Sequence, residues 1–337
     1  MKLTEQIIQE CLAARKRCVL FDHPDRGIIE VRGSDRIQFL NNILSNDIKS
    51  LSAGEGMPAC FLNAQAKLIA YMNALCFDQF LWLALDYRVK DKLLEALHKT
   101  IIMEQVELVD RSDELKLISL HGPQARRLFK TVLKQDEPTE LLSHRPVTID
   151  GISTVVIRIN LIGETGYGFL TQKDKATRVQ AALEQNGGAK ELTHIQASAM
   201  EILRIEAGIP RYGVDFDESS IPLEAGLDKA VSFSKGCFPG QEILARLDSR
   251  GGVSKKLCGL VLKGETPPKK DDRILQDGAE VGRITSAVFS PTLKKTIAMG
   301  YLKKECWVIG CLVAVEIGNI QIPARVESIP FYAAGTA

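Results

Sequence analysis

The sequence predicts a fold of the α+β class, in which helices and mainly antiparallel strands are mixed without the regular alternation of a parallel sheet. Two observations carry this prediction. Through residues 1–254, amphipathic helices follow one another irregularly with short strand-like runs joined by tight turns. From residue 257 onward, short apolar runs are separated by Gly, Pro and Asp, which is typical of a small β-barrel. With 337 residues, 45% of them hydrophobic, the chain can fill more than one core.

The first part of the chain contains both kinds of element. Its first element is an amphipathic helix, because four apolar residues recur at helical spacing: Ile7, Ile8, Cys11 and Leu12. Residues 27–33 alternate in polarity and end at glycine, as a strand does, and Ser34 is the expected N-cap of the helix that follows. The remaining elements are paired strands over 57–63 and 68–76, a strand over 80–86 and a charged helix over 88–99.

Similar elements recur further along the chain. Residues 115–120 predict a strand and residues 124–133 a helix, with a His-Gly-Pro turn between them. A β-rich run over 152–159 leads to a glycine-rich turn over 163–168. After a Gly-Gly pair, five β runs follow: 257–262, 280–285, 296–301, 312–317 and 320–326. This change of composition divides the chain near residue 254, into residues 1–254 and a barrel domain over residues 255–337.

The overall composition argues against several classes of partner. The net charge of +1 gives no general attraction to nucleic acid or to a membrane surface, and no apolar run is long enough to cross a bilayer. The first residues lack the apolar segment of an export signal, so we expect a cytoplasmic protein, and we expect a monomer. None of the eight cysteines has C-x-x-C spacing, and the nearest pair, Cys306 and Cys311, has no histidine beside it. Reduced thiols and no stable metal site are therefore expected.

Residues 235–242 read Lys-Gly-Cys-Phe-Pro-Gly-Gln-Glu and form the first candidate site. Glycine and proline on both sides of Cys237 predict an exposed turn. If Gln241 begins a helix, Cys237 precedes its N-terminus, where the helix dipole favours a thiolate and Lys235 adds positive charge. Such a thiolate can bond to a sulfur species, an iron centre or an electrophilic carbon, whereas the alternative is a buried cysteine in a structural turn. Glu242 is either a base for Cys237 or an acid that complements the helix dipole.

Several motifs elsewhere occur in an order that is informative. They are Gly33-Ser34-Asp35, Gly122-Pro123, Gly163-Glu164-Thr165-Gly166-Tyr167, Leu203-Arg204-Ile205-Glu206-Ala207-Gly208, Pro222-x-Glu224-Ala225-Gly226 and Gly282-x-Ile284-Thr285-Ser286. In this order they resemble the glycine-cleavage T-protein (aminomethyltransferase) superfamily over essentially the whole chain. The resemblance implies a cloverleaf of two mixed α/β lobes and a C-terminal β-barrel around a central cleft. It also implies that tetrahydrofolate is the cofactor and lies in that cleft.

Within this superfamily, residues 235–242 resemble the YgfZ-type folate-binding branch and its mitochondrial iron–sulfur assembly relatives, because aminomethyltransferases have no cysteine at this point. This resemblance implies an accessory protein in iron–sulfur cluster assembly or repair, which supports iron–sulfur-dependent tRNA modification. Iron–sulfur proteins would be its partners, and Cys237 would contact the cluster, a sulfur intermediate or a partner protein.

The chain departs from the T-protein pattern at positions that carry its chemistry. The resemblance matches the Asp-Asp pair of the T-protein second hairpin to residues 66–71, which read Ala-Lys-Leu-Ile-Ala-Tyr and contain no carboxylate. A glutamate that grips the pterin in T-proteins is Gly168 here, and an arginine is Met200. These losses argue against aminomethyl transfer.

The resemblance suggests seven residues for a folate site: Glu164, Tyr167, Met200, Arg204, Lys67, Gln241 and Arg250. Glu164 and Tyr167 either line the cleft, with Tyr167 stacked on the pterin, or belong to a turn that serves geometry alone. Arg204 is expected in a structural ion pair, as is Glu206. Lys67 either faces the cleft or is a surface lysine.

A basic strip follows the Cys237 motif, with a single acid, Asp248, inside it: Arg246, Arg250, Lys255 and Lys256. It suits a folate glutamate tail or an RNA backbone, or is a solvated face. Without interleaved aromatic residues, stacking on single-stranded nucleic acid is not supported.

The first expectation is therefore a folate-binding accessory protein for iron–sulfur maturation. The alternative is a folate-dependent one-carbon transferase of the aminomethyl type on an unknown substrate, with Lys67, Glu164 or Glu242 as its base. A third interpretation is an RNA-binding or scaffold module that uses the basic strip. Whether the chain catalyses a reaction stays open at this point.

Overall fold

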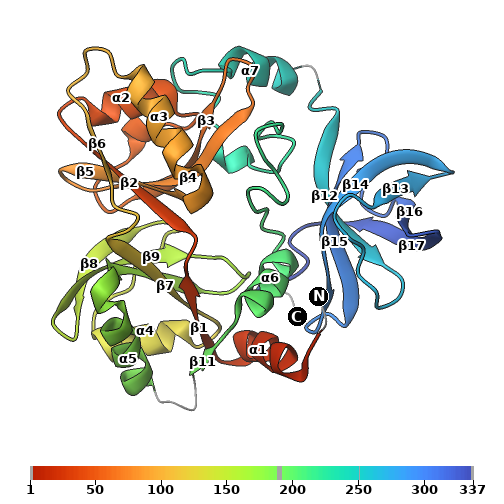
Figure 1. Cartoon of the computed structure of the whole chain (residues 1–337), viewed down its shortest axis with the longest axis horizontal. Helices are drawn as coiled ribbons and strands as arrows, with labels where there is room; N and C mark the ends of the chain where they lie inside the picture. The colour runs from red at the N-terminus through yellow and green to blue at the C-terminus, as the bar shows by residue number, and fades with distance from the viewer. Residues whose placement is uncertain (1–2, 188–191, 250, 335–337) are drawn as a thin grey trace.

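The computed structural model of the chain describes residues 3–187, 192–249 and 251–334. Figure 1 shows two mixed α/β lobes on one side and a closed barrel on the other, with helix α6 (Ala197–Glu206) between them. The predicted α+β class is confirmed, as is the arrangement of two lobes and a C-terminal barrel that the resemblance implied.

The first lobe is built on a five-stranded sheet in the order β3-β4-β5-β2-β6. Its elements are β2 (Arg26–Arg32), α2 (Arg36–Ile43), β3 (Gly56–Leu62), β4 (Leu68–Cys76), β5 (Phe80–Asp86), α3 (Lys90–Thr100) and β6 (Glu107–Asp110). The predicted cap at Ser34 is wrong, because Asp35 occupies the N-cap position of α2. The Asp35 carboxylate makes no cap and instead accepts a hydrogen bond from the backbone N–H of Gln105 (2.7 Å).

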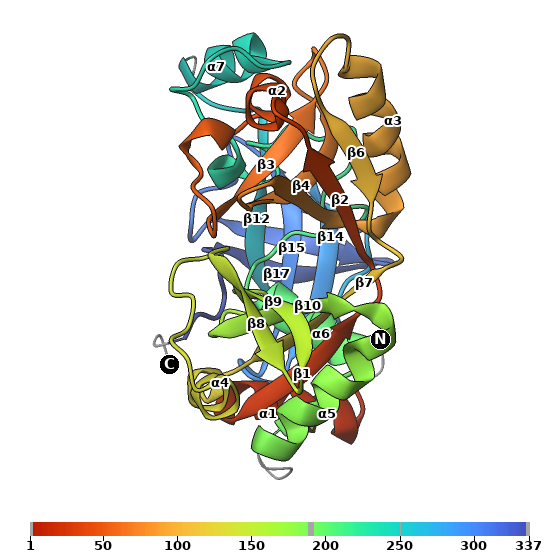
Figure 2. The same ribbon diagram turned by 90° about the vertical axis from the view of Figure 1, so that its left-hand side faces the viewer.

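The second lobe contains a six-stranded sheet in the order β11-β1-β7-β10-β9-β8. Its elements are β1 (Cys18–His23), β7 (Leu115–His121), α4 (Ala125–Leu133), β8 (His144–Ile149), β9 (Ile152–Ile159), β10 (Gly166–Gln172), α5 (Ala176–Gly187) and β11 (Leu192–His194). Figure 2 shows β1 in this lobe and the next strand, β2, in the other. The chain thus starts in the second lobe, builds the first and returns at β7, so the two lobes are intertwined.

The barrel closes in the order β12-β15-β14-β13-β16-β17. Its strands are β12 (Lys255–Leu262), β13 (Arg273–Gln276), β14 (Ala279–Ser290), β15 (Lys295–Lys303), β16 (Leu312–Ile317) and β17 (Ile320–Glu327). Leu260, Ile284 and Val315 are among the residues that fill its interior. The five predicted β runs all fall in these strands, whereas β13 was not predicted. The division of the chain into two domains at residue 254 stays a prediction.

Helices α1 (Glu5–Lys16) and α6 join the lobes to the barrel. Both contribute to one buried cluster that includes Cys11 and Leu203 from the helices and Val288 and Met299 from the barrel. The last helix, α7 (Gln241–Ser249), lies next to the first lobe in Figures 1 and 2. Within the described ranges, no helix combines the length and the apolar character needed to cross a bilayer.

Candidate functional site

The motif around Cys237 forms an exposed loop that is anchored on the first lobe. The Cys237 thiol is free and exposed, whereas the adjacent Phe238 is buried in a cluster with Leu62, Ala66 and Leu68 of the β3–β4 hairpin. The buried ring fixes the loop, so the thiol is presented outward from a held backbone. The exposed turn that the sequence predicts is present, and the alternative of a buried cysteine is wrong.

Gly240 brings this loop into direct contact with the turn between β3 and β4. Its φ is +81°, and a Cβ at this position would lie 2.7 Å from the Cα of Ala66 and 2.8 Å from the carbonyl oxygen of Asn63. Only glycine can make this approach. The turn is closed by Asn63 Oδ1, which accepts hydrogen bonds from the backbone N–H groups of Gln65 and Lys67. The Cys237 loop therefore rests where the resemblance places the start of the missing carboxylate pair.

Lys235 binds the end of a helix in the first lobe. Its ammonium group donates hydrogen bonds to the carbonyl oxygens of Asn41, Leu44 (2.5 Å) and Asn46 (3.2 Å), around the C-terminal end of α2. Burial lowers the pKa of Lys235 to about 8, so the group is still protonated at neutral pH. The positive charge stabilises the negative end of the α2 dipole. This capping role was not predicted, and an effect of the Lys235 charge on Cys237 stays a prediction.

Helix α7 begins at Gln241, as predicted, so Cys237 lies just before its first turn. Gln241 is half-buried, and its backbone N–H donates to the carbonyl oxygen of Phe238 (3.2 Å). Glu242 is exposed in the first turn, where a carboxylate complements the helix dipole. Its position supports that structural role, and its use as a base for Cys237 stays a prediction. Arg250 lies outside the described residues.

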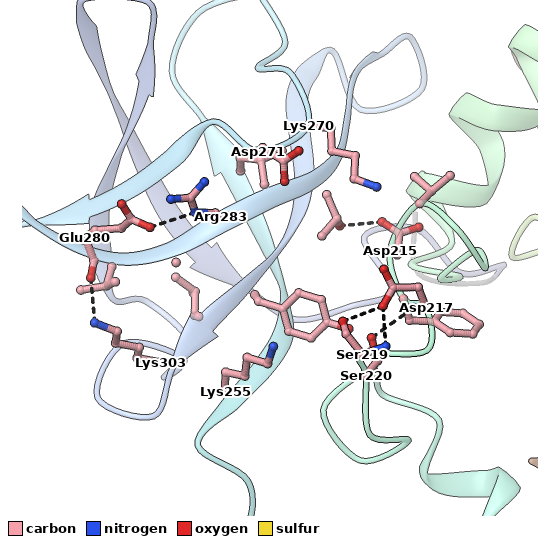
Figure 3. Close-up of a pocket in the computed structure, with 18 residues that line it drawn as sticks. Asp215, Asp217, Ser219, Ser220, Lys255, Lys270, Asp271, Glu280, Arg283 and Lys303 are labelled. Carbon is pink, nitrogen blue, oxygen red and sulfur yellow. Dashed lines mark hydrogen bonds and ion pairs between the residues drawn. The ribbon is translucent and has the colours of Figure 1, made fainter. Parts of the chain in front are cut away.

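Lys67 connects the β3–β4 turn to the wall of a pocket. Its ammonium group donates a hydrogen bond to the backbone carbonyl of Ser219, in the segment 214–220 that follows α6. This segment and strands β12, β14 and β15 enclose a pocket of about 460 Å³. Figure 3 shows its charged and polar lining: Asp215, Asp217, Ser219, Ser220, Lys255, Lys270, Asp271, Glu280, Arg283 and Lys303.

Two lysines line this pocket: Lys270 Nζ donates to the carbonyl oxygen of Gly213 (3.3 Å), and Lys255 Nζ lies 3.9 Å from Glu224 Oε2. Lys255 comes from the basic strip, and its Nζ lies 5.0 Å from the centre of the Tyr301 ring. In Figure 3, Lys255 and Lys270 approach the pocket from opposite sides. A hydrogen bond from the Ser219 hydroxyl, together with the charges of Lys270 and Lys255, holds the pKa of Asp217 below its usual value. The pocket therefore offers cations beside an ionised carboxylate.

Arg204 is a buried structural residue at the junction of α6 and the barrel. Its Nη1 lies 2.6 Å from Asp215 Oδ2, and its Nη2 donates to the hydroxyl of Ser286 on β14 (2.8 Å). Glu206 is likewise buried and lies 2.6 Å from Arg15 Nη2. The structural ion pairs expected for Arg204 and Glu206 are confirmed. The guanidinium of Arg204 is occupied by protein groups, so nothing in this geometry turns it toward a folate.

Glu164 and Tyr167 are buried in the second lobe and line neither the pocket nor the Cys237 loop. Glu164 accepts a hydrogen bond from the hydroxyl of Tyr332 (2.5 Å) and lies 3.7 Å from Arg15 Nη1. The Tyr167 ring lies 4.6 Å from that of Phe129, in the core between the sheet and α4. A ring packed there cannot stack on a pterin. The structure thus supports the geometrical role of this turn.

The turn predicted over 163–168 is shorter in the structure, because β10 begins at Gly166, and this glycine makes room for a histidine that the sequence-based predictions missed. A Cβ at Gly166 would lie 2.2 Å from Nδ1 of His121, so the imidazole packs directly on this glycine. His121 is fully buried, and its two ring nitrogens have no hydrogen-bond partner in the part of the chain that the structure describes. Burial, aided by the charges of Arg158 and Arg15, lowers the pKa of His121 to about 3. A histidine at the end of an apolar strand is the only signal of this in the sequence.

The predicted site residues therefore fall into separate places. Residues 235–242 and Lys67 meet at the β3–β4 turn, while Met200 is half-buried on α6 against the cluster that joins the helices to the barrel. Considering residues 3–187, 192–249 and 251–334, no group of three or more His, Cys, Asp or Glu side chains is arranged to hold a metal ion.

Comparison with known proteins covers almost the whole chain. The family model described as GCVT N-terminal domain matches residues 1–235, and that described as Glycine cleavage T-protein C-terminal barrel domain matches residues 255–333. An aminomethyltransferase of Symbiobacterium thermophilum is 31% identical over 97% of this chain and 89% of its own length. One of Halothermothrix orenii is 30% identical over 96% and 91%. The crystal structure of the glycine cleavage system aminomethyltransferase T from Bartonella henselae superposes with a TM-score of 0.87 at 23% identity, over 97% and 89%, and so shares the fold.

These relatives correct the first functional expectation. An accessory role in iron–sulfur cluster assembly and tRNA modification is wrong, because similarity to proteins named aminomethyltransferase extends over nearly the full length. That expectation rested on residues 235–242 and on the missing carboxylate pair over 66–71, and such local features have less weight than a match along both lobes and the barrel. Iron–sulfur proteins as partners lose their support with it. The chain belongs to the glycine cleavage T-protein family.

Proposed function

We propose that this protein is a folate-dependent one-carbon transferase of the aminomethyl type, the second expectation from the sequence. The observation that carries the proposal is the match to both T-protein family models, over residues 1–235 and 255–333. The relatives at about 30% identity carry the name aminomethyltransferase. We propose tetrahydrofolate as cofactor and a monomer as the active form.

The proposed site lies where three segments meet at the β3–β4 turn. The Cys237 loop touches the turn through Gly240, which approaches Ala66 and Asn63. The segment 214–220 touches it through the hydrogen bond from Lys67. The pocket of about 460 Å³ opens beside that segment, and this volume is in the range of small-molecule sites. The β3–β4 turn therefore contacts both the Cys237 loop and the segment that forms one wall of the pocket.

The charges of the pocket fit the acidic end of a folate. Lys255 and Lys270 can bind glutamate carboxylates, and Asp217 can accept hydrogen bonds from the amide N–H groups of a glutamyl tail. Arg283 is less available, because its Nε is hydrogen-bonded to Glu280 (2.9 Å). When bound, tetrahydrofolate would carry the one-carbon unit.

Two side chains at the turn replace the missing carboxylates. The exposed Cys237 is a nucleophile suited to an electrophilic carbon, held just before the α7 N-terminus. Lys67 Nζ is a hydrogen-bond donor at the turn, next to Ser219. Residues 235–242 are also the segment that resembles the YgfZ-type branch. In this proposal, the segment supplies the nucleophilic thiol of Cys237.

Calorimetric titration of the purified chain tests the binding step. Tetrahydrofolate is expected to bind saturably, and its triglutamate more tightly. Lys270→Met should reduce the advantage of the triglutamate by roughly fivefold, whereas Arg283→Met should preserve it. Absence of saturable binding at millimolar tetrahydrofolate would contradict the proposal.

Turnover tests the chemical step separately. Purified protein is incubated with methylenetetrahydrofolate, ammonia and a dithiol acceptor, and loss of the methylene compound is followed. Cys237→Ala is expected to abolish turnover while retaining binding, and Lys67→Met to lower kcat by about a hundredfold or more. Cys258→Ala, in the barrel, is the matched control and should retain both. Full turnover by the Cys237→Ala variant would show that the thiol takes no part in the reaction.

A further inference from the structure

A second thiol site lies in the loop between β15 and β16, away from the residues of the proposed function. Two tight turns shape this loop, one closed by Cys306 N–H on the carbonyl oxygen of Lys303 (2.9 Å) and one by Cys311 N–H on that of Val308 (3.0 Å). Each turn ends at a cysteine. The chain therefore folds back on itself between the two thiols.

One side chain of the neighbouring strand β13 contacts both sulfur atoms. The Cys306 thiol donates to Gln276 Oε1 (2.8 Å), and Gln276 Nε2 donates to Cys311 Sγ (3.3 Å). Cys311 also lies near enough to raise the pKa of Cys306. A single carboxamide thus contacts both sulfurs, which places the two thiols near each other across the loop.

The two thiols differ in their access to solvent. Cys306 is 1% exposed, whereas Cys311 is partly exposed and lies in a loop whose Val308 and Ile309 side chains are 63% and 65% exposed. Burial, followed by the proximity of Cys311 and Glu305, raises the pKa of Cys306. A soluble oxidant therefore reaches Cys311 first, and Cys306 is placed as the resolving thiol.

We propose that Cys306 and Cys311 form an intramolecular disulfide by exchange with a low-molecular-weight disulfide such as oxidised glutathione. The Cys311 thiolate attacks one sulfur of the oxidant, a mixed disulfide forms, and the first small thiol leaves as a thiolate that takes a proton. Cys306 then loses its proton and attacks the Cys311 sulfur. The bond between the two cysteines forms, and the second small thiol leaves. Two protein thiols are oxidised and one small disulfide is reduced to two thiols.

The test uses the full chain and one diagnostic peptide. Trypsin cleaves after Lys304 and Arg325, so both cysteines fall in the single peptide 305–325. The protein is exposed to oxidised glutathione, free thiols are alkylated, and the digest is analysed by mass spectrometry without reduction. We expect this peptide to take no label and no glutathione, and to regain two labels after reduction. Cys237, which is exposed, serves as an internal measure of the oxidant because it should carry glutathione.

Matched variants assign the order of attack. Cys306→Ser should trap Cys311 as the mixed disulfide, and Cys311→Ser should leave Cys306 free for alkylation. Two outcomes overturn the proposal. One is a wild-type peptide 305–325 that keeps both labels when Cys237 is fully glutathionylated. The other is a stable Cys311–glutathione adduct beside an alkylated Cys306 in the wild-type chain. Neither depends on folate binding.

Discussion

The ammonium group of Lys235 lies among three carbonyl oxygens at and just beyond the end of α2, those of Asn41, Leu44 and Asn46. Sequence neighbours suggested that its charge acts on Cys237, two residues away. The structure shows that it joins the Cys237 loop to the first lobe. At the scale of single residues, a charged side chain thus binds the polar groups that packing brings next to it, and these need not be its sequence neighbours.

Replacing Lys235 by Met is expected to lower the free energy of unfolding by about 2 kcal/mol, because hydrogen bonds to a charged group are lost and the carbonyl oxygens of Asn41 and Leu44 lose this donor. Lys49→Met is a suitable control, since Lys49 is exposed close to the same helix, and should change stability by less than about 0.5 kcal/mol. Urea denaturation of both variants measures the difference. Equal stabilities would rule out the capping role.

The buried His121 predicts loss of stability in mild acid. Its pKa is about 3 in the folded protein and near the usual 6.5 in the unfolded chain. Between these values the unfolded chain binds a proton that the folded protein does not, so stability that is complete above pH 6.5 is lost as pH falls. The slope is about 1.4 kcal/mol per pH unit for this residue. Burial also lowers the pKa of His23 well below its usual range, which adds a slope of the same sign.

Urea unfolding at pH 7, 6 and 5 measures this slope. In His121→Phe the slope should fall by about 1.4 kcal/mol per pH unit, which is the contribution of one proton. An unchanged slope in that variant would show that His121 is not the titrating group.

At the scale of elements, the Cys237 loop and the β3–β4 turn form one packed unit. Gly240 allows the two backbones to touch, and Phe238 fills the space beneath. Neither segment has the regular hydrogen bonding of a helix or a strand at this contact, so the contact itself defines the geometry of the thiol.

Gly240→Ala is therefore expected to destabilise the protein by about 2 kcal/mol or more, since the new Cβ meets backbone atoms and the φ of +81° is unfavourable for alanine. Gly236→Ala is the matched control four residues earlier, where a Cβ would meet nothing within 4 Å. It should stay within about 0.5 kcal/mol of the wild type. Thermal unfolding of the Gly240→Ala and Gly236→Ala variants measures the difference. Equal melting temperatures would contradict the close packing at Gly240.

Local patterns predicted many of these elements but not all of them. The charged helix over 88–99 corresponds to α3 (Lys90–Thr100), and the hairpin strands over 57–63 and 68–76 correspond to β3 and β4. Strand β13 has four residues, and β8 contains a proline, so neither stands out as an alternating apolar run. Those strands exist because neighbouring strands supply hydrogen-bond partners.

At the scale of the whole molecule, buried polar contacts join α6 and the segment after it to the barrel. Arg204 on α6 lies 2.6 Å from Asp215, and the Asp215 carboxylate accepts hydrogen bonds from the hydroxyls of Thr285 and Ser286 on β14 (2.6 Å each). This junction sets the position of the barrel against the pocket segment 214–220.

Arg204→Met should lower the free energy of unfolding by about 3–5 kcal/mol, because Asp215 is left buried without its cation. The ion pair between Arg283 and Glu280 is exposed, so Arg283→Met should cost at most about 1 kcal/mol. Urea denaturation compares the two arginines. A loss for Arg204→Met as small as that for Arg283→Met would show that the junction contributes little.

The sequence by itself determined the α+β class and the barrel at the C-terminus and favoured an exposed turn at Cys237, because these follow from short-range patterns of polarity and from turn residues. Its ordered motifs also indicated the family. The Cys237 motif and the missing carboxylate pair misdirected the first functional expectation, because these local features were given more weight than the match along the whole chain.

Only the tertiary structure decided which groups are neighbours. Lys235 caps a helix whose Asn41 is 194 residues away in sequence, Tyr167 is enclosed in a core, and Gln276 holds Cys306 and Cys311 together. The physical reason is that burial and hydrogen-bond partners are set by packing between distant segments. That packing also placed the Cys237 loop on the β3–β4 turn, where the proposed chemistry and its test are located.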